Sequence, residues 1–167
     1  MKRMAISLIF ALTLVWFASF RVSAEKQLFS LTVEAPSEPL KVGGELRLRV
    51  TVTNTSDRSI MFIRSPGIIP HEAFRYNIEV RDSRGESAPP SEYVRKLKTS
   101  ETRWFESSHA YTIKPGESFV DDVEVTRFYD LSQPGKYTIS VAREFPPRQK
   151  LGEGAVKSNS IDVTVVP

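Results

Sequence analysis

Apolar and polar residues alternate with a period of two through most of this 167-residue chain, which limits what it can fold into. Successive side chains of a β-strand point to opposite faces, so this period predicts strands with one buried and one wet face. No segment beyond the first 24 residues gives a convincing long helical pattern. The alternating apolar positions are Phe29, Leu31 and Val33; Leu46, Leu48, Val50 and Val52; Tyr76, Ile78 and Val80; Tyr137, Ile139 and Val141; and Ile161, Val163 and Val165.

Two further segments predict strands of less regular pattern. "SIMFIR", residues 59–64, is apolar through its middle, which is typical of a strand buried on both faces. In "SFVDDVEV", residues 118–125, the pair Asp121-Asp122 breaks the alternation and predicts a bulge. About seven mostly antiparallel strands must pair two sheets to bury their apolar faces. We therefore predict an all-β fold, an immunoglobulin-like antiparallel β-sandwich with Greek-key connections.

Turn residues agree with this fold. "KPGE" and "QPGK" open the strands near residues 118 and 137, and Gly accepts the positive φ that such turns require. Tyr137 follows Gly135 at the place of a tyrosine corner, so its hydroxyl is predicted to bond a backbone group a few residues upstream. Asn54 begins an Asn-Thr-Ser glycosylation pattern, but we interpret it as the end of a strand in a turn.

The N-terminus has the pattern of a signal peptide. Lys2 and Arg3 precede an apolar run over residues 4–20, and Val22 and Ala24 occupy the small-residue positions of a cleavage site. We predict a signal peptide over 1–24 and a single domain over 25–167, in a secreted or periplasmic bacterial protein. The alternative is an uncleaved membrane anchor, since 17 apolar residues reach the lower limit for a spanning helix.

Charge and cysteine content exclude several classes of protein. Without Lys2, Arg3 and Arg21, the 23 basic residues fall to 20 and equal the 20 acidic ones, so we expect no nucleic-acid partner. The chain has no cysteine, hence no disulfide framework, and after cleavage it has no further run that could span a membrane.

No residue set predicts catalysis, a metal or a cofactor. His71-Glu72 is followed at position 75 by Arg75, where the zinc motif H-E-x-x-H requires histidine, and His109 is 38 residues from His71. The acidic cluster of Asp121, Asp122 and Glu124 is interpreted as a charged outer face or bulge, because consecutive positions on one strand do not oppose two carboxylates across a cleft.

Two sequence segments resemble those of a known family. "LTVEAPSEPLKVGGELRLRVTVTNTSD" and "IKPGESFVDDVEVTRFYDLSQPGKYTISV" resemble the non-catalytic N-terminal β-domain that precedes the zinc core in deuterolysin-type, lysine-specific metalloendopeptidases. The resemblance covers about half of the chain after the leader. It implies a non-catalytic β-domain, since the peptidase core itself is missing.

The candidate binding residues lie in the long interruption over 83–117. It holds Tyr93, Trp104, Phe105 and Tyr111 among charged residues. These aromatics either plug one end of the sandwich as packing or form a platform for a sugar or a partner protein. The loop over 146–158, with Arg148 and Lys150, is a second candidate.

Three functions remain open at this point. The preferred one is an exported, non-catalytic protein-interaction or accessory module. The second is a carbohydrate-binding module that uses the loop aromatics. The third, suggested by the resemblance alone, is a proteinase inhibitor or pro-domain-like protein.

Overall fold

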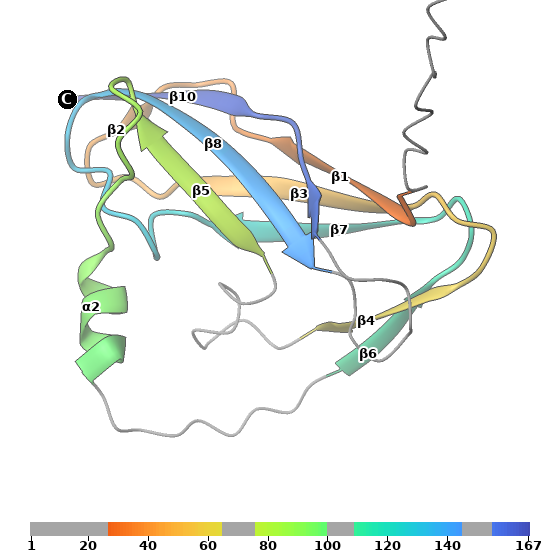
Figure 1. Ribbon diagram of the computed structural model, residues 1–167. Helices are drawn as coiled ribbons and strands as arrows, with labels where there is room; N and C mark the ends of the chain where they lie inside the picture. Colours follow the sequence, from red (N-terminus) through yellow and green to blue (C-terminus); the bar gives the residue numbers. More distant parts are fainter. Residues whose placement is uncertain (1–26, 65–75, 100–108, 145–154) are drawn as a thin grey trace, which may run out of the picture.

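The chain folds into two packed β-sheets (Figure 1). The computed structural model describes residues 27–64, 76–99, 109–144 and 155–167, so the predicted signal peptide lies outside the described residues. One sheet has the order β1-β3-β7, and the other has the order β2-β10-β8-β5, with β9 also paired to β8. The strands are β1 (Phe29–Glu34), β2 (Leu40–Lys41), β3 (Arg47–Asn54), β5 (Asn77–Asp82), β7 (Ser118–Glu124), β8 (Gly135–Glu144), β9 (Ala155–Lys157) and β10 (Ile161–Val166).

The predicted all-β sandwich is confirmed. All the pairs in these two sheets are antiparallel except β2 with β10, which run parallel. The chain crosses from one sheet to the other between β1 and β2, returns between β2 and β3, and crosses again between β7 and β8. Such crossings place sequence neighbours in opposite sheets, which is the immunoglobulin-like arrangement predicted from the alternating pattern.

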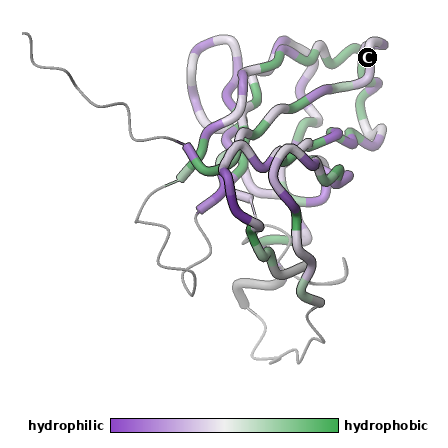
Figure 2. The backbone as a smooth tube through the Cα atoms, turned by 90° about the vertical axis from the view of Figure 1, so that its right-hand side faces the viewer, coloured by the Kyte–Doolittle hydropathy of each residue, from purple (hydrophilic) through white to green (hydrophobic). Residues whose placement is uncertain are grey.

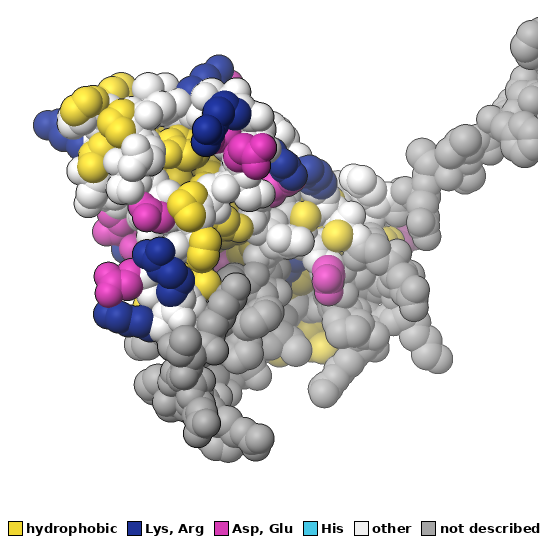
Figure 3. Space-filling view, turned by 60° about the vertical axis from the view of Figure 1, so that its left-hand side comes forward, with side chains coloured by type: hydrophobic (Ala, Val, Ile, Leu, Met, Phe, Trp, Pro, Cys, Tyr) yellow, Lys and Arg dark blue, Asp and Glu magenta, His cyan; other side chains and the backbone are white. Residues whose placement is uncertain are grey.

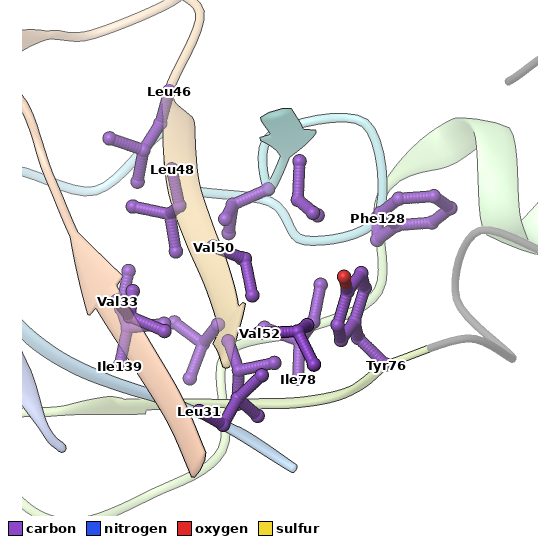
Figure 4. Close-up of a cluster of buried hydrophobic side chains, with 14 of the residues drawn as sticks. Leu31, Val33, Leu46, Leu48, Val50, Val52, Tyr76, Ile78, Phe128 and Ile139 are labelled. Atoms are coloured by element: carbon purple, nitrogen blue, oxygen red, sulfur yellow. The ribbon is translucent and has the colours of Figure 1, made fainter. Parts of the chain in front are cut away.

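The core lies between the sheets and uses the predicted apolar positions. Hydrophilic and hydrophobic residues alternate along the strands (Figure 2). Side chains from both sheets meet in the interior, with Leu48, Val50 and Val52 of β3 opposite Ile78 of β5 and Ile139 of β8 (Figure 4). Each of these five is almost entirely buried. Burying a Val, Leu or Ile side chain contributes about 1.5–3 kcal/mol, so this interior is the main stabilising feature of the fold.

A third, two-stranded sheet, here called the ribbon, follows β3 and precedes β7 in the chain, and its buried residues join the core. It consists of β4 (Ile60–Arg64) and β6 (His109–Ile113), which pair antiparallel. Met61 on β4 is 41% exposed, whereas its neighbours Ile60 and Phe62 are buried, so the prediction that this strand is buried on both faces is wrong. Residues 60–62 alternate as the other strands do, with Met61 on the solvent side.

Asn54 organises the junction between β3 and this ribbon. Its side-chain amide donates to the carbonyls of Arg58 (2.8 Å) and Ile113 (2.9 Å). Its carbonyl oxygen accepts from the Ser56 backbone N–H (2.9 Å) and hydroxyl (2.7 Å). Asn54 is buried and ends β3, which confirms its predicted place at a turn.

The Asp121-Asp122 pair does not form a bulge. β7 pairs with β3 residue by residue from Ser118 to Glu124 without an insertion. Alternation continues, so that Asp122 is exposed and Asp121 faces the interior at 4% exposure. The interpretation of Asp121 as part of a charged outer face is therefore wrong. The apparent break arises because an acid occupies an inward position.

The predicted tyrosine corner is present at the start of β8. Tyr137 is 5% exposed, and its hydroxyl donates to the carbonyl of Gln133, four residues upstream, at 2.9 Å. Gly135 has φ of +154°, in a region that is open essentially to glycine alone. The turn and the tyrosine together fix how the chain enters β8.

Replacement of Tyr137 with phenylalanine is expected to lower the free energy of unfolding by about 1 kcal/mol. The ring stays buried, and only the bond to Gln133 is lost. Urea unfolding measures the change. An unchanged midpoint would show that the hydroxyl bond contributes nothing, and a loss of several kcal/mol would show that the ring itself is misplaced.

Candidate functional site

The four predicted binding aromatics do not form one described surface. Tyr93 lies on a short helix, α2 (Glu92–Thr99), and Tyr111 lies on β6. Both are partly buried against the core. Trp104 and Phe105 lie outside the described residues, as do Arg148 and Lys150. The prediction of a platform made by all four residues therefore stays a prediction.

Tyr111 belongs to an aromatic cluster at the ribbon end of the sandwich. Its ring stacks on Phe62 with centroids 5.9 Å apart and lies 4.4 Å from Phe119. Phe62 in turn meets Phe29 edge to face at 5.4 Å. These contacts join β1, β4, β6 and β7, so Tyr111 packs between strands of the fold.

Tyr93 holds α2 against the loop after β7. Its hydroxyl accepts a bond from Arg127 at 3.0 Å, and the same guanidinium lies 4.7 Å from the centre of the ring. Ser91 caps the helix, since its hydroxyl accepts from the Val94 N–H at 3.3 Å. This helix of eight residues was not predicted from the sequence. Ser91 followed by Glu92 after two prolines is the capping signal that could have found it.

A buried polar network near the cluster was not foreseen from the sequence. The Arg143 guanidinium donates to the Tyr76 hydroxyl at 3.0 Å, and that hydroxyl donates toward the Asp121 carboxylate at 3.4 Å. Arg143 also lies between two rings, 4.5 Å from the centre of Phe62 and 4.9 Å from that of Tyr76. Both charged residues are less than 7% exposed. The network ties β8, β4 and β7 together across the sandwich.

Three shallow hollows are each lined in part by Tyr129. One of about 370 Å³ is lined by residues of β5, β8 and β9, and one of about 290 Å³ by β5, Val94 and Phe128. A third, of about 350 Å³, is lined by Gly44, Glu92, Arg95 and Asp130 among others. The face that carries α2 mixes basic and acidic side chains (Figure 3). These hollows hold few convergent groups, and their mixed polar lining does not indicate a particular small ligand.

Two tyrosines are expected to ionise late in an alkaline titration. Burial raises the pKa of Tyr129, with Glu79 adding to the effect, and burial also raises the pKa of Tyr137, with Asp82 and Asp130 adding. For both tyrosines, the pKa in the folded state is higher than the pKa in the unfolded state. The stability from the neutral phenols is therefore complete below an unfolded pKa of about 10, and it is lost as pH rises through the folded pKa.

An ultraviolet titration of the folded chain and of the Tyr129→Phe and Tyr137→Phe variants tests this expectation. Each substitution should remove one of the late transitions. Ionisation of all five tyrosines at the pH of free tyrosine would contradict it.

The described part of the chain shows neither a metal-binding cluster nor a membrane-spanning helix. Within residues 27–64, 76–99, 109–144 and 155–167, no three His, Cys, Asp or Glu side chains are grouped so that they could hold a metal ion. Across the same ranges, no helix has the length and apolar content to cross a membrane.

Comparison with known proteins identifies a family. The family model described as "Flagellar collar protein C, N-terminal domain" matches residues 25–166. No curated protein matches the chain. Among solved structures, a β-glucosidase from Erythrobacter marinus is similar over 83% of this chain at 19% identity, with a TM-score of 0.42. The chain spans 15% of the length of that enzyme, and a likeness at this level carries no argument.

Proposed function

Because this chain belongs to the family of the flagellar collar protein C N-terminal domain, we propose that it is an exported, non-catalytic domain that binds another protein of a flagellar collar. The observation that carries the proposal is the family match, which extends over residues 25–166 and so includes every described strand and the helix. The function lies in contact between proteins rather than in a reaction.

The distribution of apolar residues supports a contact made through polar surface and backbone. Large apolar side chains are packed in the core, and among the described residues those exposed are Val42, Met61 and Val120. They belong to three different parts of the fold, so the exposed large apolar side chains of the described residues are scattered. Interfaces outside obligate complexes are about as polar as ordinary protein surface, and such a surface suits an assembly component that also exists alone.

Export supports a place in the cell envelope. The first 24 residues have the pattern of a signal peptide, and the chain has no cysteine that would require an oxidising folding step. We expect the folded domain to work outside the cytoplasmic membrane, where its partner in the collar is reached.

Deletion of residues 27–167 from the gene, followed by electron cryotomography of the flagellar motors, tests the proposal. We expect collar density to be lost or incomplete, and the full chain expressed in trans to restore it. A chain with Arg81→Met, an exposed change on β5, serves as the matched control and should restore the collar equally. Collars unchanged in the deletion strain would contradict the proposed function.

A further inference from the structure

On its side away from β3, β7 has no partner strand among the described residues. In an antiparallel pair, alternate residues direct their N–H and C=O groups toward the partner strand and away from it. Val125 donates to Leu46 and Asn54 donates to Glu117, so the odd-numbered residues of β7 face β3. Ser118, Val120, Asp122 and Glu124 therefore direct their backbone groups away from β3. In the described part of the chain, no strand pairs with β7 on that side, where it borders its sheet (Figure 1).

Other edges of the two sheets are protected. The Asn159 side chain takes the place of a strand beside β1, accepting from the Val33 N–H at 2.9 Å and donating to the Val33 carbonyl at 3.0 Å. Beside β5, Ala88 donates to the Val80 carbonyl, Asp82 donates to the Glu86 carbonyl, and Tyr129 donates to the Ile78 carbonyl. β2 has two residues and follows Pro39. β7 has seven residues and no such cover among the described segments.

Charges on the outer face of the β1-β3-β7 sheet alternate in sign from strand to strand. Glu34, Arg49 and Asp122 stand opposite one another in register across the three strands. In the next row, Arg47 pairs with Glu124 at 3.4 Å. Thr51 stands opposite Val120, which is 50% exposed. Opposite charges facing each other across strands are stabilising, and like charges are destabilising.

We infer that the edge of β7 accepts an extended segment of another protein, which adds as a strand and carries basic residues opposite Asp122 and Glu124 and an apolar residue beside Val120. This inference rests on the proposed protein-binding function and names its surface and the chemistry of its partner. Hydrogen bonds to the backbone groups of β7 provide the affinity, and the side chains of Asp122 and Glu124 provide specificity for a basic segment.

A second copy of this chain does not fit the edge. β7 carries three acids and no base, so two copies of it placed side by side would bring acids together. The inward-facing Asp121 also disfavours indiscriminate strand addition. The acids that repel a copy of the same strand attract a basic one, which makes the edge selective.

Titration of the chain with short peptides, followed by amide hydrogen exchange resolved for each residue by NMR, tests the inference. The probe is a blocked nine-residue peptide whose alternate residues, those that would stand opposite Glu124, Asp122 and Val120, are lysine, lysine and valine, with threonine between them. One control replaces its lysines with glutamates, and the other has the same residues in block order. The alternating basic peptide is expected to slow exchange at Val120, Asp122 and Glu124 at least tenfold, and neither control should do so. Equal protection by the block peptide, or no protection, overturns the inference.

Two variants locate the effect. Val120→Pro removes an N–H that points away from β3, so the β3–β7 ladder stays intact while strand addition is blocked, and protection should be lost. Val120→Thr keeps the N–H and should keep the protection. If the proline variant fails to fold, the pair Asp122→Asn and Glu124→Gln replaces it, with peptide affinity expected to fall about fivefold. Unchanged affinity in that pair overturns the charge assignment.

The inference and the proposed function fail in different ways. If Val120→Pro restores the collar in the deletion strain as well as the unaltered chain does, the edge of β7 is not the contact and the proposed function stands. If the deletion strain builds normal collars, the proposed function fails whatever the peptides do.

Discussion

Replacing Arg143 with methionine is expected to lower the free energy of unfolding by about 3–5 kcal/mol. Methionine fills much of the space between Phe62 and Tyr76, but it leaves the Tyr76 hydroxyl and the buried Asp121 without the guanidinium charge. A buried carboxylate that loses its balancing charge is strongly destabilising. Urea unfolding of the variant and of the unaltered chain measures the difference.

Two further variants test the origin of this loss. Asp121→Asn combined with Arg143→Met removes both charges, so the double variant should lose less stability than the sum of the two single variants. Arg81→Met, at an exposed site on β5, is the matched control and should change stability far less. Additive losses in the double variant would show that the two charges do not interact.

Replacing Asn54 with alanine is expected to lower the free energy of unfolding by about 3 kcal/mol, because buried groups lose their bonds. The Ile113 carbonyl and the Ser56 N–H lose their bonds to the Asn54 side chain in a buried place. Thermal and urea unfolding measure the loss, and near-zero change would contradict the role of Asn54 at the junction.

Aspartate is the matched replacement at this position. Asn54→Asp keeps the oxygen that accepts from Ser56, but it sets a second oxygen against the carbonyls of Arg58 and Ile113. Protonation restores one donor, so the folded state should raise the pKa of this carboxyl above its unfolded value. The variant should therefore be more stable at low pH and lose that stability as pH rises through the raised pKa. A variant equally stable across that range would contradict this geometry.

The seven predicted strands are all present, and five of them were predicted from the period of two, which reflects one buried face per strand. The strands missed are β2, β6 and β9, which have two, five and three residues. β2 and β9 are too short to show a period, and β6 lies in a segment read as a loop. Their places depend on strands distant in sequence, such as β10 beside β2, and no local pattern contains that information.

The polar interior shows where reading the sequence fails. Asp121 occupies an inward position of β7, as the alternation requires. Because an acid at an inward position is unexpected, the sequence alone predicted a bulge there instead. Tyr76, which bonds Asp121, is 45 residues away, and Arg143, which bonds Tyr76, lies on β8. The tyrosine corner was predictable because its hydroxyl bonds a carbonyl only four residues upstream. Local contacts could be inferred, and distant polar contacts could not.

Candidate binding residues were the least predictable feature. Aromatic content pointed to the segment over 83–117, and its described members Tyr93 and Tyr111 pack against the core from two different elements. The edge of β7 has no sequence signature of its own, since an edge strand and a central strand differ only in their neighbours. The resemblance to the β-domain of deuterolysin-type metalloendopeptidases stays a prediction.

Cross-linking mass spectrometry on isolated flagellar basal bodies tests most directly whether this domain works by touching another collar protein. Lysines of the domain, such as Lys114 near β7 and Lys157 on β9, provide attachment points on both sheets. We predict cross-links from this domain to a different protein of the collar, concentrated at Lys114. Cross-links confined to the chain itself, or to envelope proteins outside the flagellum, would contradict the account.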